Sequence, residues 1–287
     1  MLTMISLVDA ARGAATVEPT WYRVPLPAQA AAEKAFSIVA PLLETDQPIR
    51  VSVSFVEDGP AAYGLPHGLP LVPRGSDHPV WYPSALADAQ AGRDLLTGQP
   101  DIDLFFRRDA NWHFDAETRP PPGQRDFLTV VIHELLHGLG LATHLTNRAG
   151  LGSYGRDLTF LDQLPLTIPA PPSVGLPTLY DTRLVTRQGR PLTDPEAFPN
   201  PSRSLGAALG GPLFFSGEQA RRANDGRPVR IYALSPSHLD PLGIQEGSTL
   251  ALFGPSLPRN RVIHEVHPVL VAMLADLGWP MTAPVND

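Results

Sequence analysis

The chain has 287 residues, 43% of them hydrophobic, which is enough for one large domain or for two subdomains that share a cleft. Its formal net charge of −7 gives no basic surface for nucleic acid, and no apolar run reaches the length that spans a bilayer. It contains no cysteine, so histidines and carboxylates must provide any metal ligands.

The beginning of the chain, residues 1–26, is predicted to be an amino-terminal tail. A short apolar patch at residues 4–8 is interrupted by Asp9 and has no lysine or arginine before it, so it makes a poor signal peptide. Two lobes are expected after the tail. Residues 27–146 are predicted to form the first lobe and residues 147–287 the second.

The first lobe begins with alternating helices and strands. Residues 27–44 carry apolar side chains at helical spacing, and residues 49–56 alternate between apolar and polar side chains, as a half-buried strand does. Glycines and prolines predict a loop over residues 59–80. A second helix is expected at residues 83–96, and a second alternating strand at residues 101–106.

The best-defined element is a helix that begins at Phe127, after a short hairpin expected at residues 111–115. The acidic residue Asp126 precedes it, where the helix dipole favours a negative charge. The helix is too apolar for an exposed position. Because polar groups in a buried helix need partners, the histidines and the glutamate that it carries require an explanation.

Within this helix, His133 and His137 are four residues apart, so they lie one turn apart on one face and can reach the same metal ion. Glu134 follows the first histidine, close enough to take a proton from water at the metal. The motif can occur by chance on a surface helix, but the apolar context favours zinc. It therefore predicts metal-assisted hydrolysis.

The second lobe is rich in proline and glycine from residue 147 to about residue 230. Its best helix candidate is at residues 216–223. Apolar residues such as Phe160 and Phe214 recur throughout, which favours a packed, loop-rich lobe over a linker. A closing helix is predicted at residues 267–279, because proline suits its first turn and glycine its carboxy-terminal cap.

The stretch from His133 to Gly140 resembles the opening of the metzincin signature, in which the glycine lets the backbone turn sharply out of the helix. The usual third histidine of that signature would fall at Thr143, so the compact form is excluded. The chain is similar instead to the leishmanolysin-like branch, in which a long insertion precedes the third zinc histidine. Residues 237–240 resemble the segment that carries this histidine.

The resemblance extends over most of residues 50–280, with residues 272–279 similar to the closing helix of the family. Phe253 stands in place of the methionine beneath the metal, so an apolar floor is expected. The resemblance implies a metzincin-like α+β fold, with a mixed sheet and the motif helix in the first lobe. It also implies secretion, and a substrate extended along an edge strand, for which residues 101–106 are the best candidate.

Three residues compete to be the third metal ligand. The resemblance assigns this role to His238, and Asp240 would then be either a supporting carboxylate or a turn residue. His144 follows His137 by seven residues, about 10 Å along a continuous helix, so it can bind the same ion only if the chain turns. Glu265 would complete a site of the His-His-Glu type, but it lies in a histidine cluster that suits a solvated helix start.

These features predict a zinc-dependent endopeptidase that acts on a protein or peptide substrate. His133, His137 and His238 would hold Zn²⁺, and Glu134 would act as general base and then as proton donor to the leaving amine. The alternative is a zinc-stabilised binding or adhesion module without catalytic activity. A structural zinc site uses four protein ligands, so three ligands beside a glutamate favour catalysis.

Overall fold

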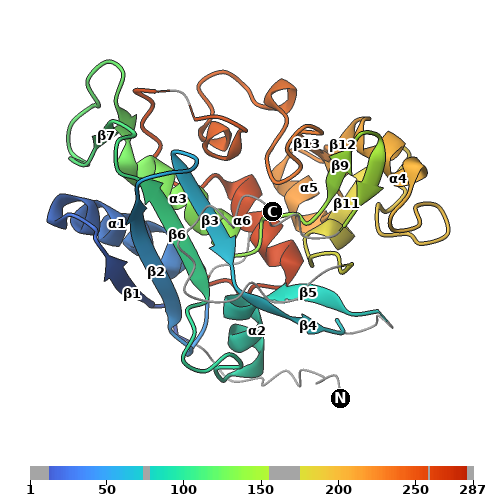
Figure 1. Ribbon diagram of the computed structural model, residues 1–287, viewed down its shortest axis with the longest axis horizontal. Helices are drawn as coiled ribbons and strands as arrows, with labels where there is room; N and C mark the ends of the chain where they lie inside the picture. Colours follow the sequence, from blue (N-terminus) through green and yellow to red (C-terminus); the bar gives the residue numbers. More distant parts are fainter. Residues whose placement is uncertain (1–12, 74–77, 155–174, 258, 283–287) are drawn as a thin grey trace.

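The computed structural model describes residues 13–73, 78–154, 175–257 and 259–282 (Figure 1). Its main sheet has four strands in the order β1–β2–β6–β3. Their bounds are β1 (Val17–Tyr22), β2 (Ile49–Val56), β3 (Ala62–Pro66) and β6 (Ile102–Arg107). β1, β2 and β6 run parallel, whereas β3 runs antiparallel to β6, so the sheet is mixed and the predicted α+β class is confirmed.

The first strand lies inside residues 1–26, so the prediction of a tail is wrong for β1. β1 pairs with β2 along its whole length, and α1 (Leu26–Val39) connects the two as a crossover helix. This helix, continued by a short 3₁₀ turn (Ala40–Leu42), confirms the helix predicted at residues 27–44. The apolar patch at residues 4–8 lies outside the described residues.

Residues 59–80 were expected to form a loop, and this prediction is wrong. The segment contains β3 and β4 (Gly68–Leu71), and β5 (Val80–Pro83) begins at its end. β3 is an edge strand, where a proline needs no hydrogen-bonding partner for its nitrogen, so the glycine and proline that predicted a loop are tolerated there.

Helix α2 (Ser84–Ala91) follows β5 and is shorter than the predicted residues 83–96. It ends at Gly92, whose φ of 64° suits glycine and stops the helix six residues before Gly98. Asp88 on this helix is only 3% exposed and accepts a hydrogen bond of 2.9 Å from the Leu95 backbone N–H. An acidic side chain in this position makes stability depend on pH.

Burial raises the pKa of Asp88 to about 7. The stability that its proton provides is therefore complete below the unfolded value near pH 4 and is lost as the pH rises through 7. Asp88→Asn stays neutral and keeps an acceptor for Leu95, so it should raise the thermal midpoint above pH 7 and leave it nearly unchanged at pH 4. Calorimetry across this range measures the difference. An equal shift at every pH, or the same profile in an Asp58→Asn control at an exposed position, would contradict the assignment.

The hairpin expected at residues 111–115 is not formed. Instead, β7 (Trp112–His113) pairs in parallel with β8 (Arg125–Asp126), immediately before the motif helix α3 (Phe127–Gly138). A parallel pair needs a longer connection than a hairpin turn, and the residues between the two strands provide it.

Every residue of α3 is buried, as its sequence predicts. Asp126 caps its first turn by accepting hydrogen bonds from the backbone N–H and the hydroxyl of Thr129, at 2.8 and 2.6 Å. His264 contacts the same carboxylate oxygen at 2.7 Å, so the later half of the chain fixes the start of this helix. At the other end, Gly140 has a φ of 115°, which lets the chain leave the helix sharply as predicted.

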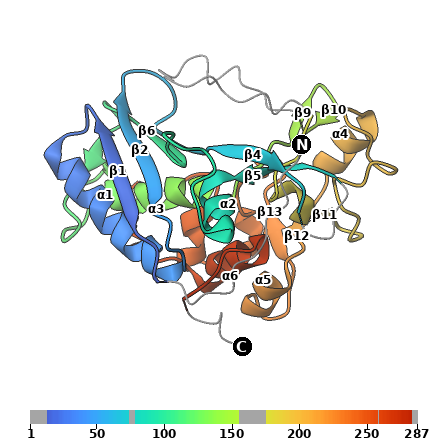
Figure 2. The ribbon, with the colours of Figure 1, turned by 90° about the horizontal axis from the view of Figure 1, so that it is seen from below.

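The second half of the chain is built from short elements around loops, as expected. Its helices are α4 (Arg203–Leu209), α5 (Glu218–Ala223) and α6 (Pro268–Leu277). Its strands are β9 (Thr146–Arg148), β10 (Leu151–Ser153), β11 (Leu184–Thr186), β12 (Leu213–Phe215) and β13 (Val229–Ile231). Figure 2 shows most of these elements on the opposite side of the molecule from β1, β2 and α1. The helices predicted at residues 216–223 and 267–279 are confirmed, α4 was not predicted, and Phe160 lies outside the described residues.

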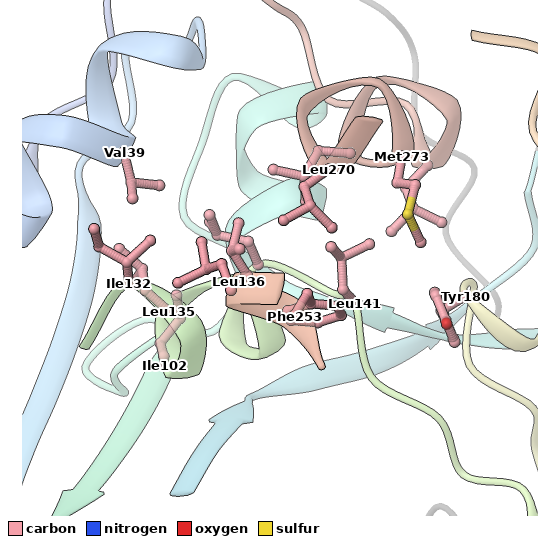
Figure 3. Close-up of a cluster of buried hydrophobic side chains, with 14 of the residues drawn as sticks. Val39, Ile102, Ile132, Leu135, Leu136, Leu141, Tyr180, Phe253, Leu270 and Met273 are labelled. Carbon is pink, nitrogen blue, oxygen red and sulfur yellow. The ribbon is translucent and has the colours of Figure 1, made fainter. Parts of the chain in front are cut away.

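One hydrophobic core joins the two halves. Figure 3 shows α3 in its middle, with Val39 of α1 on one side and Leu270 and Met273 of α6 on the other. The Trp279 indole N–H, just after α6, donates a hydrogen bond of 2.9 Å to the Leu139 carbonyl at the end of α3. Among the described residues, no helix has both the length and the apolar character needed to cross a bilayer.

Candidate metal centre and cleft

Two histidines of α3 meet a third from a distant part of the sequence. The Nε2 atom of His137 lies 3.2 Å from that of His133, one turn earlier, and 3.2 Å from that of His238, which follows β13. The possible ligand atoms of all three lie within 4.8 Å of one another. The structure therefore brings together the three histidines that the sequence analysis combined.

The second nitrogen of each imidazole is held by a partner. Nδ1 of His133 lies 2.6 Å from the Leu252 carbonyl, and Nδ1 of His137 lies 2.8 Å from the Leu141 carbonyl. A carbonyl can only accept, so these two Nδ1 atoms carry the proton and each Nε2 presents a lone pair. Nδ1 of His238 lies 2.8 Å from the Ser235 hydroxyl. Such partners orient the histidines of metal sites.

The electrostatic environment keeps the imidazoles uncharged. Burial lowers the pKa of His133 and of His238 to about 4, and it lowers the pKa of His137 well below its usual value. Lone pairs that face one another in a buried site repel unless a cation lies between them. Nitrogens about 2.0–2.1 Å from a tetrahedral ion are roughly 3.4 Å apart, close to the observed spacing, so the three histidines can bind a metal ion.

The catalytic candidate Glu134 lies next to this cluster and is 7% exposed. Burial raises its pKa to about 8, although a hydrogen bond from the Gly64 backbone opposes the shift. A carboxyl group in this range can accept and return a proton near neutral pH. Gly64 is necessary here, because a Cβ atom at this position would lie 2.0 Å from the Glu134 carbonyl oxygen. β3 can thus lie directly against α3.

The edge strand beside the histidines is β3. Residues 101–106 were the expected edge, and this is wrong, since β6 lies between β2 and β3 (Figure 1). Ala61 accepts a hydrogen bond from Arg107 of β6, and His67 donates one to the carbonyl of Asp101, just before β6. The alternation of an antiparallel pair therefore turns the backbone groups of Ala62 and Gly64 away from the sheet. Both residues line the cleft of about 540 Å³ that contains the histidines.

Phe253 forms the apolar floor that the sequence analysis expected. It is fully buried, and its ring centroid lies 5.3 Å from that of His133, 4.7 Å from that of His137 and 5.9 Å from that of His238. The preceding residue provides the carbonyl that holds His133. This short segment therefore packs against the ligands and also orients one of them.

The competing ligand candidates lie outside the cluster. His144 lines the cleft, but its Nδ1 lies 3.4 Å from the Leu176 carbonyl. Glu265 is exposed. Asp240 is a structural residue, since its side chain accepts a hydrogen bond from Leu242 and forms an ion pair of 2.9 Å with Arg230. Its interpretation as a turn residue is confirmed.

The sequence analysis missed Asp181, which is fully buried near the cleft. Its carboxylate accepts hydrogen bonds from the Thr143 hydroxyl and from the backbone N–H groups of His144 and Thr178, the latter two at 3.1 and 2.8 Å. Burial raises its pKa to about 6. These bonds hold the chain just after Leu141, whose carbonyl orients His137. An isolated aspartate in a proline-rich region gives no sequence signal for this role.

No protein-family model, curated protein or solved structure matches this chain. The structure itself defines a cleft with a buried glutamate beside three histidines that are close enough to bind a metal ion.

Proposed function

We propose that this chain is a zinc-dependent endopeptidase of the metzincin type, similar to the leishmanolysin-like branch. The observation that carries the proposal is the convergence of the imidazoles of His133, His137 and His238 beside the buried Glu134 in an open cleft. Catalytic zinc sites use three protein ligands and leave one position for water or substrate, whereas structural sites use four.

The donor set supports zinc as the metal. Neutral imidazoles suit zinc and other late transition metals, and the distances between the nitrogens suit a tetrahedral ion. A zinc ion at this position would lower the pKa of water to about 7 and polarise the scissile carbonyl. His133 and His137 would be fixed as ligands through their Nδ1 protons, and Phe253 would exclude water from beneath the site.

In this reaction Glu134 takes a proton from the attacking water and later gives it to the nitrogen of the leaving amine. Its burial supports the second step, because a raised pKa means that the carboxyl group holds a proton that it can then return to the amine. The hydrogen bond from Gly64 holds the carboxylate in one orientation. A glutamate needed only for folding would not have to line the cleft, as Glu134 does.

The substrate we propose is a peptide in extended conformation, paired with β3. The outward N–H and carbonyl of Ala62 and the outward carbonyl of Gly64 provide hydrogen-bonding groups for an added strand, whereas the Gly64 N–H is already bonded to Glu134. Both residues line the same cleft as Glu134. Peptide binding at a sheet edge depends on the main chain. This arrangement therefore suits protein substrates rather than one particular small molecule.

The second candidate is a zinc-stabilised binding or adhesion module without catalytic activity. It is favoured by one observation, that His238 joins the second half of the chain to α3 and would stabilise the fold through the metal. This module would need the histidines, but it would not need Glu134.

Replacement of Glu134 by glutamine separates the two candidates. Glu134→Gln should lower the turnover of a quenched-fluorescent peptide library by about 10²- to 10⁴-fold, because the proton acceptor is lost, while zinc content stays at that of the wild type. Glu265→Gln, at an exposed glutamate, is the matched control and should keep full turnover. Unchanged turnover in Glu134→Gln would refute its role as base, and the absence of any turnover in wild type would favour the binding module.

A further inference from the structure

One end of the cleft carries a basic side chain that the reaction does not use. Arg125, in β8, lines the cleft together with Trp112, Val130 and Leu257. The register of β7 and β8 places Trp112 directly beside Arg125. This end therefore combines an apolar wall with a guanidinium group.

The Arg125 guanidinium has no partner among the residues that the structure describes. Its backbone N–H donates to the Asn111 carbonyl, but its side chain forms no ion pair and no hydrogen bond there. The neighbouring Arg107, by contrast, forms an ion pair with Asp109 at 2.5 Å. An unpaired, partly buried cation in a cleft is costly unless a ligand provides the opposite charge.

A second loop brings further positive charge to the same place. Asn260 donates from its backbone to the Gln124 carbonyl at 3.1 Å, and its side chain accepts from Gly123 at 3.0 Å. Arg259 is thereby held close to Arg125. Burial lowers the pKa of Arg125, and repulsion from Arg259 and Arg107 lowers it further, so the local field attracts anions.

The direction of β3 determines which part of a bound peptide would lie at the end of the cleft that contains Arg125. β3 runs from Ala62, opposite Phe106, to Pro66, opposite Ile102. The Phe106 ring packs on Phe127 at the start of α3, and Ile102 lies against its last residue, Gly138. Antiparallel pairing is the more stable kind, so a peptide on β3 would place its carboxy-terminal part near the start of α3, beside Arg125.

We propose that Arg125 selects substrates with an aspartate or glutamate on the carboxy-terminal side of the scissile bond, a preference that rests on the proposed endopeptidase function. Phe127, the first residue of α3, is six residues before His133, about 9 Å along the helix, and Arg125 lies just before it in β8. An extended peptide advances about 3.3 Å per residue, so the acidic side chain belongs to the first four residues after the cleaved bond.

The test uses pairs of quenched-fluorescent peptides that differ only by aspartate or asparagine, moved through these four positions. At one position, wild type should show a kcat/KM about tenfold higher for the aspartate peptide, since hydrogen bonds between charged groups contribute on the order of tenfold or more. Arg125→Gln should remove this preference, and Arg125→Glu should favour lysine instead. Arg190→Gln, at an exposed arginine outside the cleft, is the matched control and should behave as wild type.

A binding measurement distinguishes failure of this inference from failure of the proposed function. The zinc-loaded Glu134→Gln protein is titrated with the same peptides, and fluorescence anisotropy reports affinity without turnover. Acidic preference in binding that Arg125→Gln removes, in a wild type that cleaves nothing, would keep the inference and overturn the endopeptidase. Cleavage and binding that do not distinguish aspartate from asparagine, or a preference that survives Arg125→Gln, would overturn the inference alone.

Discussion

His238→Ala should abolish turnover and weaken zinc binding by far more than the 10- to 100-fold that loss of a supporting partner costs, because only the two histidines of α3 would remain. His144→Ala should leave both properties nearly intact. The two residues are a well-matched pair, since both line the same cleft but only His238 lies within 3.2 Å of another ligand nitrogen. Zinc titration against a competing chelator measures the difference.

The reverse result would show that the metal lies elsewhere. If His144→Ala lost zinc and His238→Ala kept it, the chain near Gly140 would have to rearrange to bring His144 to the helix pair. The hydrogen bonds that Asp181 accepts at Thr143 and His144 oppose such a rearrangement. Each variant should also be checked for a wild-type circular dichroism spectrum, so that misfolding is not mistaken for ligand loss.

Removal of the metal should lower the thermal midpoint by roughly 10 °C. A ligand at 1,000 times its dissociation constant stabilises the folded state by about 4 kcal/mol, and for a chain of this size each kcal/mol corresponds to about 2–4 °C. The structural reason is that the three imidazoles belong to α3 and to the segment after β13. Without a cation, the lone pairs of these imidazoles repel one another. The metal then no longer joins α3 to the segment after β13, so the folded state is less stable. Calorimetry with and without a chelator measures the shift.

The control for this experiment is the His238→Ala protein, in which the chelator should have almost no effect on the midpoint. Addition of zinc to the stripped wild type should restore both the midpoint and peptide hydrolysis. A wild-type midpoint that does not respond to exhaustive chelation would mean that the histidines are not joined by a metal. Hydrolysis that persists under those conditions would exclude the zinc mechanism.

Much of the first half could be predicted from the sequence, because its elements are long and periodic. α1, β2 and β6 follow the spacing of their apolar residues, and α3 follows from its apolar character and its motif. The pairing of His133 with His137 is a local property of one helix. Periodicity does not identify His238 as the third ligand. That assignment depends on the order of short segments that resemble a known family.

What could not be predicted depends on tertiary contacts. β3 contains a glycine and a proline, which are typical of loops, and it is a strand only because β6 pairs with one side of it and α3 supports it beneath Gly64. β6 was misplaced as the edge for the same reason, since its neighbour had not been recognised. Asp181 acts through hydrogen bonds to Thr143 and His144 in a distant segment, and such contacts leave no pattern in the sequence.

The support of His133 by the Leu252 carbonyl also has a consequence for the order in which the site can form during synthesis. α3 and both of its histidines leave the ribosome more than a hundred residues before Leu252 and Phe253. A growing chain therefore carries the His133–His137 pair without its third imidazole, its floor or the acceptor for His133. The cleft stays incomplete until Phe253 has been made, so an unfinished chain would lack the site on which the proposed endopeptidase activity depends.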